Sequence, residues 1–148
     1  MSDAGDRLAT MTFDDIMAYM KADGWPIEPL REQTFQSSFK GEQRSFQFFV
    51  HAESVYLVLA VVPYQRLPVD EEEAQRLMDK LLHLNNEMTF AKFSVDEDGD
   101  VVLSVEYPLA HLDESELRDA LDVLTYYANL HWLEIQPMGD DPLLPRSV

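Results

Sequence analysis

Residues 77–130 read LMDKLLHLNNEMTFAKFSVDEDGDVVLSVEYPLAHLDESELRDALDVLTYYANL, and this stretch decides the fold. A helical pattern leads into a strand at 89–95, an acidic turn at Asp96–Gly99, and a second strand at 100–107. Apolar residues alternate in both strands, and a glycine in the turn accepts a positive φ, so the pattern predicts a hairpin. Asp113, with a glutamate three positions later, begins a capped helix. The stretch therefore predicts a helix–hairpin–helix unit.

The preceding part of the chain predicts two further helices and three strands. The first helix begins at Thr12, where the spacing to Asp15 is that of a capping box, and ends at Gly24. The second begins at Asp70, whose acidic first turn suits the helix dipole. Three strands are predicted around Phe35–Phe39, at 44–51 and at 55–62. The short connections between them favour antiparallel neighbours.

These elements predict an α+β fold with the order α-β-β-β-α-β-β-α. The five strands form one antiparallel sheet, and the helices pack on one of its faces. A length of 148 residues is typical of one domain. We expect this domain to span residues 12–136, between a flexible tail at 1–11 and an extended tail at 137–148.

Composition excludes several classes of function. The net charge is −17, which repels the phosphates of nucleic acids and of anionic membranes. The acidic surface serves solubility alone, which is the simpler interpretation, or it also favours a basic protein segment as partner. The hydrophobic content of 46% argues against disorder. The chain has no cysteine, its first residues lack the pattern of a secretory signal, and its longest apolar run, Val55–Pro63, is too short to cross a bilayer. We therefore expect a cytoplasmic protein.

The acidic turn is the best candidate for a metal site, and its spacing argues against one. Asp96, Asp98 and Asp100 match the first three ligands of an EF-hand loop. However, Gly99 stands at loop position four and Tyr107 at position twelve, where the loop needs glycine at six and glutamate at twelve. The turn is better interpreted as part of the hairpin.

No other pattern indicates catalysis. The four histidines form no ligand pair at metal-binding spacing; they are His51, His83, His111 and His131. Phosphate-binding loops and nucleophile motifs are also missing from the sequence. We therefore predict no catalytic residue, no cofactor and no metal, and a protein that is not an enzyme.

One apolar group is not explained by packing under the helices. Alternation places Phe49, Tyr56, Val58 and Val62 on the sheet face opposite the helices, where polar side chains are expected. Apolar side chains clustered on a surface usually mark an interface. The alternative is that a helix or the carboxy-terminal tail covers them within the same molecule. The sequence leaves both alternatives open.

The segment LLHLNNEMTFAKFSVDEDGDVVLSVEYPL and the helix from Asp113 resemble the YbjN-like family of bacterial sensory transduction regulators. Members of this family resemble the chaperones of type III secretion. The resemblance implies a non-enzymatic, dimer-forming domain that holds an extended segment of another protein. It supplies no catalytic residues. The first hypothesis is thus a chaperone-like or regulatory protein-binding domain, and the second is a structural homodimer with no client. An enzyme is the third. Either the second helix or the sheet face could form the dimer.

Overall fold

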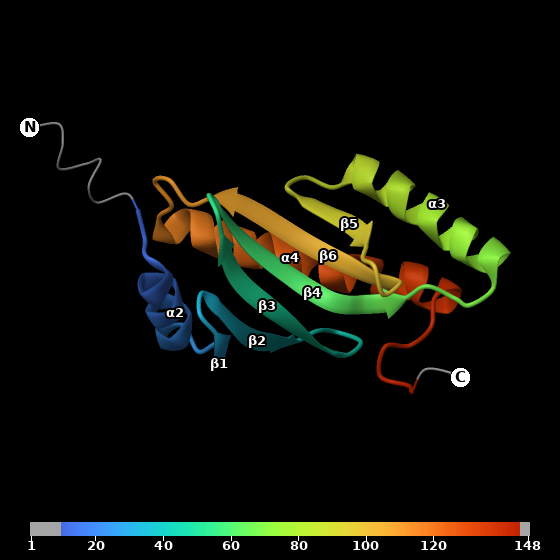
Figure 1. The fold of residues 1–148 in the computed structure, drawn as a ribbon, viewed down its shortest axis with the longest axis horizontal. Helices are drawn as coiled ribbons and strands as arrows, with labels where there is room; N and C mark the ends of the chain where they lie inside the picture. Colours follow the sequence, from blue (N-terminus) through green and yellow to red (C-terminus); the bar gives the residue numbers. More distant parts are fainter. Residues whose placement is uncertain (1–9, 146–148) are drawn as a thin grey trace, which may run out of the picture.

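The computed structural model describes residues 10–145, which form one antiparallel six-stranded sheet and one layer of helices (Figure 1). The elements in chain order are α2 (Phe13–Ala22), β1 (Glu28–Arg31), β2 (Thr34–Lys40), β3 (Ser45–Glu53), β4 (Tyr56–Arg66), α3 (Glu71–Glu87), β5 (Ala91–Val95), β6 (Asp100–Pro108), α4 (Glu114–Ile135) and the 3-10 helix η1 (Gln136–Met138). The strand order across the sheet is β1-β2-β3-β4-β6-β5. The fold class is therefore α+β.

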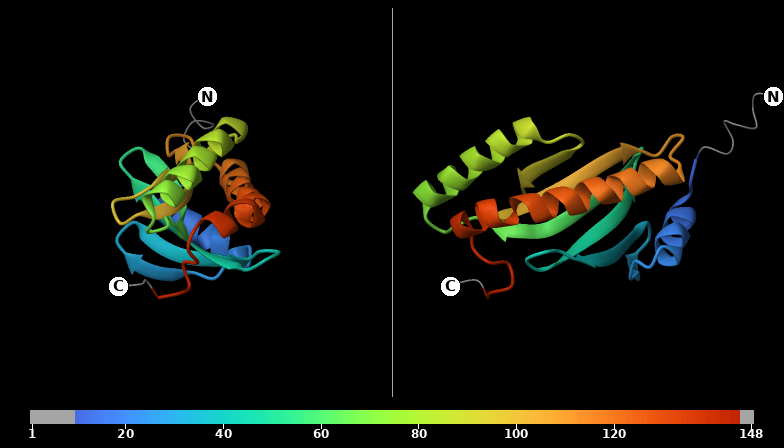
Figure 2. Two further views of the ribbon diagram at one scale, coloured as in Figure 1. Left: turned by 90° about the vertical axis from the view of Figure 1, so that its right-hand side faces the viewer. Right: turned by 180° about the vertical axis from the view of Figure 1, so that it is seen from behind.

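The three α-helices lie on the same face of the sheet (Figures 1 and 2). Helix α4 runs along the sheet, α3 lies beside it at the β5 margin, and α2 packs on β2 and β3. Their inner residues join those of the strands in one core. The fully buried members include Ile16, Phe48, Leu59, Leu77, Leu103 and Leu124. Between α3 and α4, the Lys80 ammonium and the Glu134 carboxylate lie 2.7 Å apart.

The helix starts agree with the sequence prediction. Thr12 and Asp15 form a reciprocal capping box, and so do Asp113 and Glu116. The Asp70 carboxylate accepts a hydrogen bond from the first turn of α3. The hydrogen bond that the Asp113 carboxylate accepts from the Glu116 amide, helped by the Ser115 hydroxyl, holds the pKa of Asp113 below its ordinary value. Each cap satisfies amide groups that would otherwise lack a partner.

The acidic turn is also a hairpin, as predicted. Gly99 has a φ of +81°, which favours glycine. The Asp96 carboxylate accepts hydrogen bonds from the amides of Asp98 and Asp100, at 2.9 and 3.0 Å. The turn thus uses its first carboxylate to hold its own backbone.

The sheet has six strands, so the prediction of five was wrong. The missed strand is β1, which pairs with β2 so that Glu28 lies opposite Gln36. All four of its residues are exposed, and one of them is Pro29. A short edge strand without a buried side has no alternation of apolar and polar residues, and alternation is the signal on which the prediction depended.

Strands β3 and β4 part half-way along their length (Figure 1). Phe49–Glu53 of β3 pairs with Tyr56–Ala60 of β4, whereas the beginning of β3 pairs with β2 alone. The second half of β4 continues beside β6 to Arg66. On the core side, aromatic rings join the two strands where the backbones separate: the Phe46 and Tyr64 rings stack with centroids 5.7 Å apart.

The carboxy-terminal segment returns to the sheet after η1. Asp140 and Arg66 form an isolated antiparallel bridge at the end of β4. Near the other end, the Met11 amide donates to the Leu112 carbonyl. Most of the predicted amino-terminal tail lies outside the described residues, and the domain boundaries stay a prediction. Among residues 10–145, no helix combines the length and apolar character that spanning a bilayer requires.

Candidate protein-binding face

The predicted apolar patch lies on the sheet face that the helices leave open. Phe49 is opposite Ala60, and Val58 is opposite His51 on one side and Glu106 on the other. Tyr56 is 48% exposed, and the other three patch residues are partly exposed. None of the four is packed against the core cluster. Phe49 thus lies diagonally across from Val58, and Tyr56 follows on the same face two residues before Val58.

Val62 lies apart from the other three patch residues. It falls in the irregular stretch between Val61 and Gln65, where the register of β4 against β6 shifts. Pro142 and Leu143 of the carboxy-terminal segment line the same hollow as Val62. One end of the patch is therefore approached by the chain's own tail, and its middle is not.

The patch has a polar border built from side-chain pairs between strands. The Gln36 amide donates to the Gln47 carbonyl oxygen at 2.8 Å, and the Lys92 ammonium lies 3.4 Å from a Glu106 carboxylate oxygen. Such cross-strand pairs fix the polar groups beside the apolar ones. One further apolar residue of this face was missed: Val102 of β6, which alternates with the buried Val101. The alternation alone could have found it.

The two edges of the sheet differ. At the β5 edge, the side chain of Asn85 from α3 bonds both backbone groups of Phe93: it accepts from the amide at 2.7 Å and donates to the carbonyl at 3.0 Å. At the other edge, β1 pairs with β2 alone. An edge strand with unpaired backbone groups is a template for another chain. Asn85 blocks that template at β5, and β1 remains open.

Replacing Asn85 with alanine should lower the free energy of unfolding by about 1–3 kcal/mol, because two hydrogen bonds to partly buried backbone groups are lost. Denaturant unfolding of the variant measures the loss. The matched control is Asn86→Ala, a change at the exposed neighbouring position. Equal stability of the two variants would contradict a role for Asn85 in holding α3 on β5.

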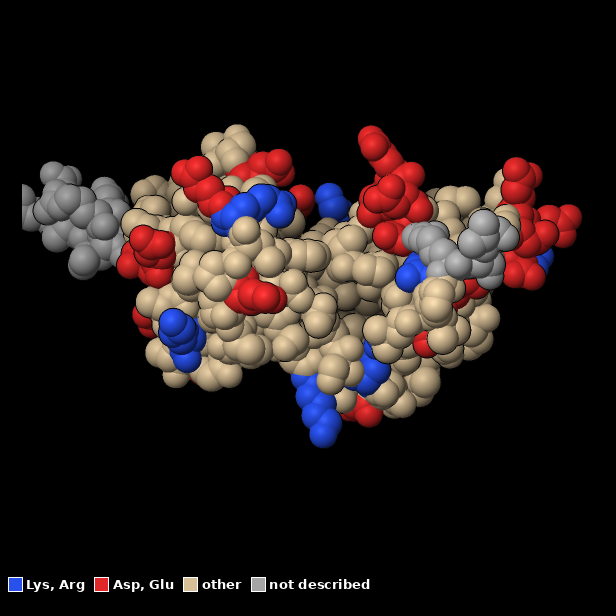
Figure 3. All heavy atoms as spheres, turned by 60° about the horizontal axis from the view of Figure 1, so that its bottom comes forward, with Lys and Arg blue, Asp and Glu red and all other residues tan. Residues whose placement is uncertain are grey.

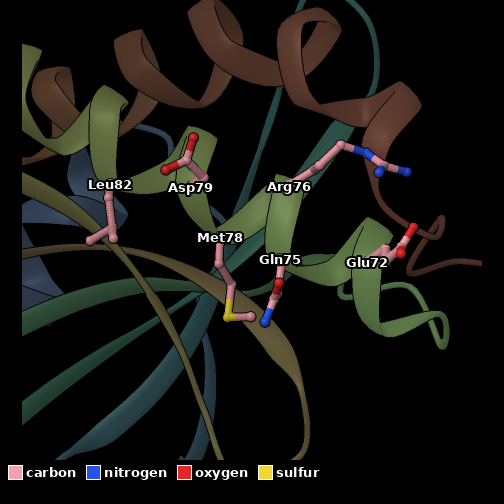
Figure 4. A pocket seen from close by; sticks show the side chains of 6 residues that line it. All are labelled: Glu72, Gln75, Arg76, Met78, Asp79 and Leu82. Carbon is pink, nitrogen blue, oxygen red and sulfur yellow. The ribbon is translucent and has the colours of Figure 1, made fainter.

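Helix α3 presents a second apolar surface, beside a shallow hollow (Figure 4). Leu82 is 69% exposed and Met78 is 36% exposed. Met78 lies about 100° around the helix from the buried Leu77, and Leu82 lies about 100° from the buried Leu81, so both flank the inner stripe. The charged and polar residues of this hollow are Glu72, Gln75, Arg76 and Asp79.

Among the described residues, one cluster of carboxylates could hold a metal ion, and the histidines lie apart from it. Carboxylate oxygens of Asp96, Asp98 and Asp100 come within 4.8 Å of one another, and the turn's own hydrogen bonds account for the position of Asp96. The histidines are dispersed: His51 on the open face, His131 on the inner side of α4 and His83 on the outside of α3.

Charged groups are unevenly distributed over the surface (Figure 3). In the view from the β2–β3 side, acidic side chains gather mainly along the upper border and toward the ends, and the middle is mostly uncharged and hollowed. An uncharged centre with a charged border is the usual composition of an interface.

Comparison with known proteins identifies the family. None of the curated proteins matches the chain. A chain in the crystal structure of the ExsC-ExsE complex is 20% identical to this chain and superposes with a TM-score of 0.49. The alignment covers 99% of this chain and 97% of that chain. The sequence model of the YbjN family, described as "Putative bacterial sensory transduction regulator", matches residues 12–126. Because this match spans well over half of the chain, the protein belongs to the YbjN family.

Proposed function

We propose that this protein is a non-enzymatic, regulatory or chaperone-like domain that binds an extended segment of another protein on its open sheet face. The observation that carries the proposal is the patch of Phe49, Tyr56 and Val58, which no helix covers in the described part of the chain. Binding would remove these side chains from water, which is the main favourable contribution to protein association.

The face is a better docking surface than the open edge. Strand β1 has four residues and includes Pro29, which has no amide hydrogen to donate. A partner strand at this edge would therefore form few backbone hydrogen bonds. The face offers side chains from β3 and β4 at alternate positions, which suits a segment with apolar residues at the same period.

Charge favours a basic segment. Glu53 lies opposite Tyr56 and Glu106 lies opposite Val58, so carboxylates stand beside the patch on two strands. Lys92 lies close to Glu106 and partly offsets its charge. The whole chain carries −17, which also raises the association rate of basic partners.

A homodimer without a client is the second candidate, and the exposed Met78 and Leu82 on α3 favour it. Two copies that pack these side chains together would bury apolar surface that is now exposed. Dimerisation through α3 leaves the open face free for a partner, whereas dimerisation through the open face uses it up.

Val58→Asp is the test of the patch. The new carboxylate would stand next to Glu106 and His51 in the middle of the face, so binding should weaken by about tenfold or more. The probe is an array of short peptides with alternate apolar residues and basic, neutral or acidic residues between them. We expect the wild-type protein to retain the basic members and Val58→Asp to lose them.

Val69→Asp is the matched control, because Val69 is 86% exposed and lies in the loop before α3. The proposal fails if Val58→Asp folds with wild-type stability and retains the same peptides, or if the wild-type protein retains none. Sedimentation of Val58→Asp and Leu82→Asp tests the homodimer candidate by locating the surface through which a dimer forms. A dimer lost only in Leu82→Asp assigns the dimer to α3, and a dimer lost in Val58→Asp assigns it to the open face.

A further inference from the structure

The place where β3 and β4 part is a cleft with two cationic side chains. It is lined by the start of β3, the second half of β4 and the carboxy-terminal segment, and it encloses about 420 Å³. Arg44 stands at the β3 side, where its guanidinium lies 4.6 Å from the centre of the Trp132 ring. Arg66 stands at the end of β4. Of these two arginines, Arg44 lines the cleft and Arg66 lies beside it, and both contact the carboxy-terminal segment.

The carboxy-terminal segment is seated at this cleft as a bound peptide would be. Arg66 and Asp140 exchange both backbone hydrogen bonds, at 2.9 and 3.1 Å. The Arg66 guanidinium donates to the carbonyls of Pro142 and Leu144, at 2.9 and 2.6 Å. Arg44 forms a salt bridge of 3.4 Å with Asp141. Backbone pairing combined with arginine recognition of acidic and carbonyl oxygens is a mode of peptide binding.

The segment occupies the mouth of the cleft without filling it. Leu143 lines the cleft and is still 75% exposed, and Leu144 is 61% exposed. Beneath the segment, the Gln65 side chain is fully buried, and both of its amide atoms lack a hydrogen-bond partner. Gly139 crosses so near that a Cβ there would stand 3.0 Å from the Gln65 oxygen. The segment therefore contacts the fold closely at Gly139, whereas its two leucines bury little of their surface.

From this geometry we propose that the cleft is a second peptide-binding site, selective for an extended segment of another protein in which acidic residues precede proline and leucine. The chain's own Asp140–Leu144 holds the site in the absence of that segment. This site adjoins the open face at Val62 but does not include Phe49, Tyr56 or Val58, and it has the opposite charge preference, so either can fail without the other. The resting occupant is a competitor in cis, and its tether gives it a high effective concentration.

The test uses the full-length protein and a fluorescent peptide with the sequence of residues 139–145, Gly-Asp-Asp-Pro-Leu-Leu-Pro. Asp141→Lys removes the salt bridge and places a cation between Arg44 and Arg66, so the tail should leave the cleft. Fluorescence anisotropy should then show the peptide binding about tenfold or more tightly to Asp141→Lys than to the wild-type protein. Equal binding by the two proteins, or no binding by the variant, overturns the proposal.

Two controls assign the binding to the cleft. In the Asp141→Lys background, Arg66→Ala should weaken binding about tenfold or more, because the guanidinium bonds to two carbonyls are lost. Arg76→Ala, a change at an exposed arginine of α3, should leave it unchanged. A peptide with both aspartates replaced by lysine should not bind. Binding that ignores Arg66 or the aspartates contradicts the assignment.

Hydrogen exchange gives a second measurement that needs no variant. In the wild-type protein the Asp140 amide is bonded to Arg66 and should exchange slowly. Excess peptide should displace the tail and speed exchange at Asp140 about tenfold or more, with the Arg66 amide still protected by the peptide. An Asp140 amide that stays protected in excess peptide shows that the tail is a permanent part of the fold.

Discussion

Replacing Tyr64 with alanine is expected to lower the free energy of unfolding by about 3–5 kcal/mol, the usual cost of removing a large buried aromatic side chain. Tyr64 is 1% exposed, and its ring packs against those of Phe46 and Trp132 with centroids 5.7 and 5.6 Å away. Its hydroxyl donates to the Ala128 carbonyl of α4 at 2.7 Å. The side chain thus joins β4, β3 and α4 at the point where the two strands separate. Denaturant unfolding measures the effect.

Two further variants separate the ring from the hydroxyl. Tyr64→Phe keeps the ring and should cost about 0.5–1.5 kcal/mol, because the hydrogen bond from the hydroxyl to the Ala128 carbonyl is lost. Tyr126→Ala, a change at a tyrosine that is 59% exposed, should change stability by less than about 1 kcal/mol. A cost for Tyr64→Ala as small as that for Tyr126→Ala would show that the aromatic cluster does not hold the strands.

The same tyrosine predicts a dependence on alkaline pH. Burial raises the pKa of Tyr64 above its ordinary value of 10.0, so the folded state holds the phenolic proton more tightly than the unfolded state. The contribution to stability is complete below that ordinary value and is lost as pH rises above it. Tyr64→Phe has no proton to release at this position, so its stability should fall less steeply over the same range.

Gly41→Val is expected to destabilise the protein by about 2–4 kcal/mol, since overpacking is added to the loss of a hydrogen bond. A Cβ at this position would stand 2.5 Å from the Asn129 side-chain oxygen and 2.7 Å from the Arg44 carbonyl. Asn129 could not move away freely, because the same oxygen accepts the Glu42 amide at 2.9 Å. The β2–β3 turn would then separate from α4.

The control for Gly41→Val is Gln43→Val, a change at an exposed position of the same turn. Thermal unfolding should show a clear loss for the first variant and little change for the second. Equal melting temperatures for both would mean that the turn does not depend on its contact with α4. Loss of the turn contact should also move Arg44, so Gly41→Val should weaken peptide binding at the cleft.

The elements with strong local signals were predictable. Alternating apolar residues located the β5–β6 hairpin, and capping residues located the starts of α2, α3 and α4. Strand β1 had neither signal, because its residues are exposed and its pairing with β2 is decided by tertiary structure. The buried stripe of α3 is narrow, consisting of Leu77, Leu81 and Leu84, and it leaves Met78 at the surface.

Part of the candidate site was also predictable from the alternation of apolar residues. Alternation alone was enough to place Phe49, Tyr56 and Val58 on one face. It could not show that β3 and β4 part beyond Ala60, because β3 alternates on both sides of Phe49 and the pairing between strands is decided by the tertiary structure. The roles of Asn85 and Arg66 were also beyond the sequence, because each bonds backbone groups whose positions depend on the folded chain.

The separation of β3 and β4 also gives the molecule a mechanical weak line. Five residue pairs join these strands between one lobe, formed by α2 and β1–β3, and another, formed by β4–β6 with α3 and α4. The lobes are also joined by the Met11–Leu112 backbone hydrogen bond and by the packing of Phe46 on Tyr64 and Trp132. Rotation about this short seam would widen one side of the sheet without breaking the hydrogen bonds inside either lobe. A ligand wedged between the lobes would then change the angle between them.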